Sequence, residues 1–225
     1  TEAGRGTNET EHNVTLTKGF YLGKYEVTQA QYEAVMTGNT NSLSATPSEW
    51  PNNPNRPVEK VSWADAQVFL TRLNAQQSAN IPAGWAYVLP TESQREYACR
   101  AGTTTAYSWG ATIASSNANY NWDGAANDGS DFKQTRDVGQ YAANPWGFFD
   151  MQGNVWEWTA DWYQAAYPTG NPIIDPTGPA SGSDRVKRGG SWYNVGPNLR
   201  SAGRLLIPPS PRNNNLGFRV GFQQQ

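Results

Sequence analysis

Two arginine- and glycine-containing stretches near the C-terminus enclose a segment of different character. The first stretch is Arg185–Trp192 and the second is Asn213–Val220. The segment between them, Tyr193–Pro211, interleaves arginine, serine and alanine with tyrosine, valine, leucine, isoleucine and proline. We interpret the stretches as fixed brackets around an interchangeable surface. The rest of the chain must then supply the core, and ten Trp and eleven Tyr among 22 Gly and 15 Pro predict large packed rings joined by many turns.

The length and charge of the chain limit its class. A chain of 225 residues suits one domain, 1–225, and no linker-like tract divides it. A charged fraction of 16% and a net charge of −2 provide no basic surface, so we expect no nucleic-acid partner. No run of about 18 apolar residues occurs, so we expect no membrane insertion by this segment.

The single cysteine and the single histidine are both interpreted as structural. Cys99 has no second cysteine to pair with, so no internal disulfide forms. The cysteine content therefore does not distinguish an oxidising from a reducing cellular compartment. We expect Cys99 to be a buried apolar filler and His12 to be an exposed flanking residue. We also expect a monomer, with a cell-surface, extracellular or phage-associated location favoured.

Two capping boxes and one apolar pattern predict helices. Thr28 and Thr91 are each followed three residues later by a glutamine that can reach back to the cap, and a further helix is expected to start at Ser62, where Asp65 suits the first turn. The helix after Ser62 places its apolar residues on one face, namely Trp63, Ala66, Phe69, Leu70 and Leu73. The helix after Thr91 carries Cys99 and ends near Gly102.

The remaining chain predicts short strands and long loops. The expected strands lie at Val14–Leu22, Trp156–Thr159, Val186–Trp192 and Gly217–Phe222. The proline-rich stretch Pro47–Pro57 is expected to be a loop, as is the aperiodic region Thr103–Tyr141.

An ordered set of motifs runs through nearly the whole chain. The motifs are Phe20–Thr28, Pro57–Ala66, Leu89–Glu92 with Glu96–Ala98, Gly153–Trp162 and the two brackets. In this order and spacing they resemble the formylglycine-generating enzyme (sulfatase-modifying factor) family. The resemblance implies an α+β, loop-rich single domain with the C-type lectin-like fold. Two residues depart from the family: Arg95 replaces a usual tryptophan, which suggests a more solvated helix face, and Gln152 precedes the Gly-Asn pair.

The chemistry of that family is not retained. Its enzymes hold copper through two cysteines that follow the first bracket, because copper(I) requires soft thiolates. The first of these positions falls at or near Asn194 and the second lies in the region up to Leu199, and neither is cysteine. Related sulfoxide synthases bind iron through several histidines, whereas this chain has His12 alone. We therefore expect neither copper nor iron, and no enzymatic activity.

The bracketed segment also resembles the variable region of diversity-generating retroelement proteins, in which the adenines of asparagine codons are randomised. The resemblance implies a variable region over 192–218. The candidate ligand-binding residues are Trp192, Tyr193, Asn194, Val195, Asn198, Gly203, Leu205, Leu206, Ile207, Pro208 and Pro211. The substituted positions, from Tyr193 onward, hold residues that adenine changes in an asparagine codon can produce. The framework residues between them are Arg200, Ser201, Ala202, Arg204, Pro209 and Arg212.

Three functions stay open at this stage. The favoured function is a non-catalytic protein that binds a protein or glycan ligand through a diversified surface, on which the exposed apolar run Leu205–Ile207 would form a recognition patch. The alternatives are a fixed-specificity binding or regulatory module and a family enzyme with unfamiliar chemistry. A small-molecule ligand is also compatible with the sequence.

The resemblance implies structural calcium as well. The family site corresponds to the side chains of Asp150 and Glu157 with the carbonyls of Gly153 and Val155, and such oxygens suit calcium. A second site is placed in the loop that contains Asn119, Tyr120, Asp128 and Asp131. In the alternative interpretation, these residues hydrogen-bond within turns and bind no ion.

Overall fold

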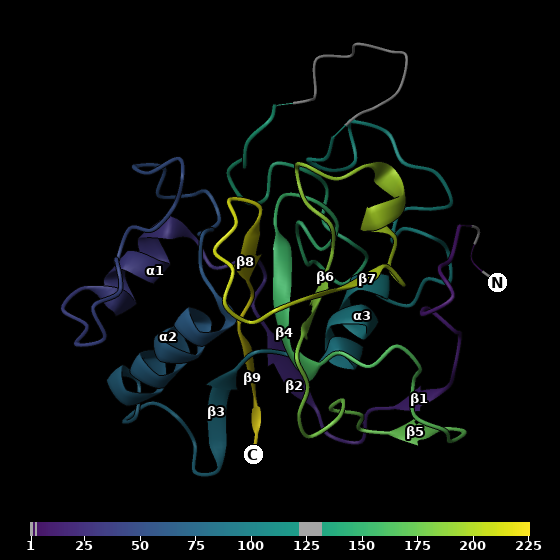
Figure 1. Ribbon diagram of the computed structural model, residues 1–225, viewed down its shortest axis with the longest axis horizontal. Helices are drawn as coiled ribbons and strands as arrows, with labels where there is room; N and C mark the ends of the chain where they lie inside the picture. Colours follow the sequence, from purple (N-terminus) through teal and green to yellow (C-terminus); the bar gives the residue numbers. More distant parts are fainter. Residues whose placement is uncertain (1, 3, 122–131) are drawn as a thin grey trace.

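A four-stranded sheet forms the centre of the molecule (Figure 1). The computed structural model describes residues 2, 4–121 and 132–225. The strands of this sheet are β4 (Trp156–Trp162), β6 (Arg185–Arg188), β7 (Arg204–Ile207) and β8 (Leu216–Phe218), in the order β7-β6-β4-β8. β4 runs antiparallel to β6 and parallel to β8, so Glu157 lies between Arg188 and Gly217. Both sequence brackets therefore supply strands that flank β4.

Two smaller sheets complete the strand content of the described residues. β2 (Phe20–Leu22) and β3 (Trp85–Val88) both pair antiparallel with β9 (Gly221–Gln224). β1 (Val14–Thr15) pairs parallel with β5 (Ile173–Ile174). Two predicted strands are thus each divided between two sheets: Val14–Leu22 gives β1 and β2, and Gly217–Phe222 falls in β8 and β9.

The three predicted helices are confirmed. They are α1 (Gln29–Met36), α2 (Trp63–Gln76) and α3 (Glu92–Arg100). The capping boxes expected at Thr28 and Thr91 are present, and the structure adds one at Ser62, where Asp65 reaches back to the cap. α3 ends when Ala101 adopts a left-handed conformation, directly before Gly102. A single-turn 3-10 helix covers Gly196–Leu199. α1 and α2 lie on one side of the central sheet and α3 on the other (Figure 1).

The main core fills the space between α1, α2 and the central sheet. It contains Tyr32, Val35, Met36, Val58, Val61, Ala66, Phe69, Leu70, Leu89, Trp156, Trp158, Ile207, Leu216 and Phe218 with Val27. Tyr32 stacks on Phe69 at 5.4 Å between ring centroids, and Phe218 meets Phe69 edge-on at 5.2 Å. Aromatic packing of this kind stabilises a fold with short elements.

The glycines of the brackets are required by close packing. A Cβ on Gly217 would lie 2.4 Å from the carbonyl oxygen of Val58. A Cβ on Gly190 would lie 2.5 Å from Leu199 Cδ1, and Gly190 also has φ of +74°. The close approach to the Val58 main chain at Gly217 and the left-handed backbone at Gly190 therefore require glycine at these two bracket positions.

Arg95 differs from its prediction. The side chain was expected on a solvated face of α3, but only 1% of it is exposed. Its guanidinium group lies against Glu157 and the carbonyl oxygen of Met151. The buried carboxylate explains why a charged residue occupies this position.

The two residues interpreted as structural have different environments. Cys99 is 2% exposed and packs with Ala98 and Met151, which confirms the prediction. His12 is half-buried and not freely exposed, because its ring lies 4.0 Å from that of Tyr167. In the described residues no helix combines the length and apolar character that crossing a membrane requires.

Candidate binding surface

The framework arginines of the segment Tyr193–Pro211 bind carboxylates from distant parts of the chain. Arg200 donates to both oxygens of Glu9, at 2.8 and 3.1 Å. Arg204 donates to both oxygens of Glu92, at 2.6 and 2.7 Å. Bidentate arginine–carboxylate pairs fix orientation as well as position. The path of the segment is therefore set by its framework side chains.

The same arrangement continues at both ends of the segment. Arg212 donates to both oxygens of Asp65, at 2.6 and 2.8 Å, in the first turn of α2. Arg188, in the first bracket, donates to the carbonyl oxygens of Ala202 and Gly203 at 2.7 and 2.8 Å. The scaffold thus holds the main chain of the segment through contacts that do not depend on the variable side chains.

Most predicted variable positions are accessible. Tyr193, Leu205, Leu206 and Pro208 are exposed, and Asn194, Val195, Asn198 and Pro211 are half-buried. We call these eight positions the recognition surface. Tyr193 is 64% exposed and Leu206 48%, which is unusual for large apolar side chains that only serve packing.

Three predicted ligand-binding residues are buried instead. Ile207 is 8% exposed and belongs to the main core. Gly203 is buried, and a Cβ there would lie 3.0 Å from the carbonyl oxygen of Arg200. Trp192 is 9% exposed and its indole N–H donates to the carbonyl oxygen of Asn214. The expectation that Gly203 and Ile207 lie on an exposed face is wrong, because β7 turns Ile207 inward and Gly203 is closely packed.

Leu205 and Leu206 do not point the same way. Both lie in the edge strand β7, where successive side chains alternate between the two faces of the sheet. Leu205 lies opposite Lys187 and shares its side with the core residue Ile207. Leu206 lies opposite Val186 and shares its side with Arg204, which donates to Glu92 of α3. The single face predicted from the sequence is therefore divided by the strand.

A structural amide lies at or near the expected position of the first family cysteine. The Asn194 side-chain oxygen accepts a hydrogen bond from the Trp156 indole at 2.7 Å and a second one from the Ser191 hydroxyl. Leu199, at the far end of the region predicted for the second cysteine, is fully buried. Asn194 therefore braces Trp156, and neither residue offers a thiolate.

The predicted calcium ligand Glu157 already has two cationic partners. Arg95 donates to both of its oxygens, at 2.8 and 3.0 Å. Arg219 donates to Glu157 Oε1 at 3.0 Å through Nη2, and its Nε contacts both oxygens. These guanidinium groups hold the pKa of Glu157 below its ordinary value despite complete burial. A calcium ion would have to compete with both, so this carboxylate does not fit the implied site.

The second carboxylate of that site, Asp150, has a polar partner too. It accepts a hydrogen bond from the Gly139 main chain at 2.6 Å, and burial raises its pKa to about 6. The main-chain N–H of Val155, rather than the carbonyl oxygen that the resemblance assigns to calcium, donates to Glu26 at 3.1 Å. In the part of the chain that the structure describes, no group of three or more His, Cys, Asp or Glu residues is arranged to hold a metal.

Chelation tests the calcium prediction directly. We expect EDTA to leave the melting temperature unchanged, because the Glu157 carboxylate is neutralised by Arg95 and Arg219 rather than by an ion. A bound ion would stabilise only the folded state, so its removal would lower the melting temperature. A fall in EDTA that added calcium reverses would contradict this expectation and support the family calcium site.

The second predicted calcium site stays a prediction. Asp128 and Asp131 lie outside the described residues. Asn119 is buried, and its amide nitrogen donates to Gln134 and Asn154. Its amide oxygen has no hydrogen-bond partner among the described atoms. Tyr120 is also buried.

Buried carboxyl groups predict an acidic optimum of stability. Burial raises the pKa of Asp161 from 3.8 to about 7 and that of Asp150 from 3.8 to about 6. The folded protein therefore holds protons that the unfolded chain has released, so stability falls as pH rises from about 4 through about 7. The urea midpoint is expected to be higher near pH 5 than near pH 7.5. The difference between the two midpoints should be smaller in Asp161→Asn, because this variant lacks one of the carboxyl groups that take up a proton in the folded state. A midpoint that rises between these two pH values would contradict the expected sign.

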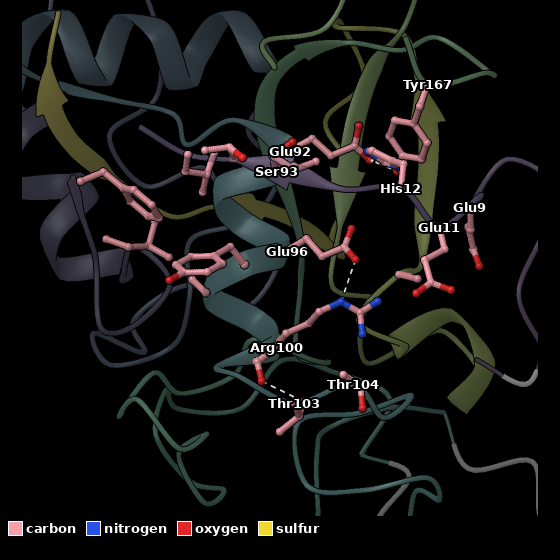
Figure 2. Close-up of a pocket in the computed structure, with 18 of the residues that line it drawn as sticks. Glu9, Glu11, His12, Glu92, Ser93, Glu96, Arg100, Thr103, Thr104 and Tyr167 are labelled. Atoms are coloured by element: carbon pink, nitrogen blue, oxygen red, sulfur yellow. Dashed lines mark hydrogen bonds and ion pairs between the residues drawn. The ribbon is translucent and has the colours of Figure 1, made fainter. Parts of the chain in front are cut away.

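A separate pocket of about 960 Å³ lies between the N-terminal segment and α3 (Figure 2). Its carboxylates are largely paired: Glu96 accepts from Arg100 at 2.8 Å, the contact dashed in Figure 2, and Glu92 accepts from Arg204. Two exposed aromatic residues, Tyr97 and Trp146, also line it, with ring centroids 4.9 Å apart. No sequence pattern predicted this pocket, because its walls come from segments that only the fold brings together.

Comparison with known proteins agrees with the fold and the motifs. The model of the sulfatase-modifying factor enzyme 1-like domain matches residues 1–223. The formylglycine-generating enzyme of Bos taurus is 35% identical over 178 residues, covering 75% of this chain and 44% of that protein. That of Streptomyces coelicolor is 36% identical over 186 residues, covering 76% and 54%. The chain thus spans about half the length of these relatives.

Solved structures show the same fold. Treponema denticola variable protein 1 superposes with a TM-score of 0.76 and 29% identity, covering 93% of this chain and 86% of that one. PvdO from Pseudomonas aeruginosa superposes with a TM-score of 0.82 and 26% identity, covering 100% and 88%. The predicted α+β fold and the resemblance to both groups are confirmed. The chain belongs to the sulfatase-modifying factor enzyme 1-like domain family.

Proposed function

We propose that this chain is a non-catalytic binding protein whose recognition surface is exchanged between variants while the framework stays constant. The observation that carries this proposal is that framework side chains and variable side chains of Tyr193–Pro211 point in different directions. Framework side chains such as Arg200 and Arg204 point into the scaffold and end on carboxylates. Exposed positions such as Tyr193 and Leu206 point outward. A change at an exposed position leaves the ion pairs of the framework intact.

Two further points support diversification. The structural similarity to Treponema denticola variable protein 1 extends over most of both chains. The substituted positions of the recognition surface hold tyrosine, valine, leucine and proline, which arise from asparagine codons by adenine changes, and its two asparagines fit unaltered codons. A protein or glycan ligand suits a surface that combines an exposed tyrosine with apolar side chains. We propose a cell-surface, extracellular or phage-associated location, where the protein would encounter protein and glycan ligands.

The absence of enzymatic activity is part of this proposal. Asn194 and Leu199 provide no thiolate where the relatives' chemistry needs two. Incubation with copper and a peptide carrying the sulfatase motif should yield no aldehyde by mass spectrometry. Turnover above a control with copper alone would refute this part of the proposal.

A fixed-specificity binding module is the second candidate, favoured by the pocket beside α3. That pocket is lined by Tyr97, Trp146 and Tyr167 and includes none of the exposed variable positions. A ligand bound there would be the same for every variant. Loss of ligand binding in Tyr97→Ala and Trp146→Ala, with binding retained in Tyr193→Ala, would favour this second function.

The DNA beside the gene gives the direct test of diversification. We expect a reverse-transcriptase gene and a near-copy of the segment that encodes Trp192–Phe218. The copy should carry asparagine codons at the eight positions of the recognition surface, including Asn194 and Asn198, where the codon is unaltered. Sequencing the locus from several isolates should also show differences confined to these positions. A locus without such a copy, and with an invariant segment among isolates, would contradict the proposal.

A further inference from the structure

One lysine beside the recognition surface has no anionic partner among the described residues. Lys187 lies in the middle of β6, opposite the exposed Leu205 on one side and the buried Trp158 on the other. Its ammonium group lies 4.8 Å from the centre of the Trp156 ring. Among the described residues no carboxylate lies within ion-pair distance of it, and the side chain is half-buried. The charge is thus held against apolar surface without compensation.

The other two cations of this strand each have a polar partner among the described residues. Arg188, the next residue in β6, binds Glu92 and Glu96. Arg185 lies between the rings of Trp63 and Trp162, at 3.7 and 3.4 Å, and donates to a main-chain carbonyl. Among the described residues, Lys187 differs from both arginines because it has neither a carboxylate nor a main-chain acceptor. Burial alone lowers the pKa of Lys187 to about 8, which agrees with a charge that lacks a partner.

The surroundings of Lys187 join it to the recognition surface. Trp156, which carries the ammonium group over its ring, donates its indole N–H to Asn194. Asn194 directly follows the exposed Tyr193, and Leu205 lies across the strand from Lys187. A ligand that covers Tyr193 and Leu205 would bring its own polar groups close to this ammonium group.

We propose that Lys187 is a constant anchor of the binding site that pairs with a carboxylate of the ligand. The inference rests on the proposed function and deepens it by naming the ligand chemistry. A single ammonium group beside Leu205 and a tryptophan ring suits a singly charged carboxylate on an apolar stem. Phosphate recognition uses several cations or main-chain N–H groups, and the neighbouring Arg185 is held elsewhere. The carboxylate is that of an acidic protein side chain or of a sugar acid.

Competitive acylation of the lysines tests this proposal on the intact chain. The protein is treated with an N-hydroxysuccinimide acetate, and the rate at each lysine is read by peptide mass spectrometry. The probes are N-acetylglutamate amide, its neutral glutamine counterpart, glucuronate and inorganic phosphate. Lys24 is a matched internal control, because it also lies over aromatic rings, at 5.1 Å from that of Phe149, but away from the segment.

We expect a carboxylate probe to slow acylation of Lys187 and not of Lys24. By mass action the slowing is about twofold when the probe is present at its dissociation constant. Stronger protection by N-acetylglutamate amide indicates a protein ligand, and stronger protection by glucuronate indicates a sugar acid. Equal protection by the glutamine counterpart, stronger protection by phosphate, or no protection at Lys187 would each overturn the proposal.

A variant gives an independent readout. Lys187→Met removes the ammonium group but fits a half-buried site over a tryptophan ring, so it should fold and melt no lower than the original protein. Titration with N-acetylglutamate amide should change the tryptophan fluorescence of the original protein and not of this variant. An equal change in both would contradict the role of Lys187. If Lys187 is not protected but substitutions at Tyr193 and Leu205 are tolerated, this inference fails and the proposed function stands. If Lys187 is protected but substitutions at Tyr193 and Leu205 unfold the protein, the carboxylate site stands and the diversified surface is refuted.

Discussion

Replacing Glu157 with alanine is expected to destabilise the protein by about 3–5 kcal/mol or to prevent folding. Arg95 and Arg219 both end on this carboxylate, and each is at most 1% exposed. Without Glu157, two guanidinium groups remain buried between α3 and the central sheet with no opposite charge. An uncompensated buried charge costs far more than the ion pair itself contributes.

Urea unfolding of Glu157→Ala measures this effect. The matched control is Glu49→Ala, which breaks the exposed pair with Lys60 at 2.8 Å and should cost no more than about 1 kcal/mol. If the two variants lose similar stability, the buried cluster does not hold the sheet to α3 as described.

The second large effect separates a core residue from its exposed neighbours in β7. Ile207→Asn is expected to cost roughly 3 kcal/mol or more, because it removes apolar contacts and buries an amide without partners. Leu205→Asn and Leu206→Asn combined should cost only about 1 kcal/mol, since both side chains are exposed.

Thermal and urea unfolding of the two proteins give the comparison. The double variant Leu205→Asn with Leu206→Asn should remain folded and is therefore usable in binding experiments. A loss of stability in the double variant that matches Ile207→Asn would show that the apolar run packs inward as a unit, and the recognition surface would lose its centre.

Local features of the fold could be predicted from the sequence, because they depend on residues close in the chain. The capping boxes at Thr28 and Thr91 involve residues three apart, and all three helices begin where expected. The framework role of Arg200 and Arg204 was also predicted from the pattern. Their partners were not, since Glu9 and Glu92 lie more than a hundred residues away.

The errors come from contacts over long distances in the sequence. Arg95 was assigned to a solvated face because its carboxylate partner, Glu157, belongs to a strand 62 residues away. Ile207 was placed on the surface because β7 was not predicted, and without the strand the alternation of Leu205, Leu206 and Ile207 is invisible. The division of one apolar run between two faces follows only from the pairing with β6.

The central claim is that exposed positions of Tyr193–Pro211 vary freely over a fixed framework. Two libraries test it, each replacing the native codons with NNC codons, the set that adenine changes generate from an asparagine codon. One library varies Tyr193, Leu205, Leu206 and Pro208, and the other varies Arg204 and Ile207 together with Gly190 and Gly217, which hold the brackets. The measurement is the fraction of each library that survives protease on a cell surface. We predict that most members of the first library and few of the second remain folded, whereas equal surviving fractions would contradict the account.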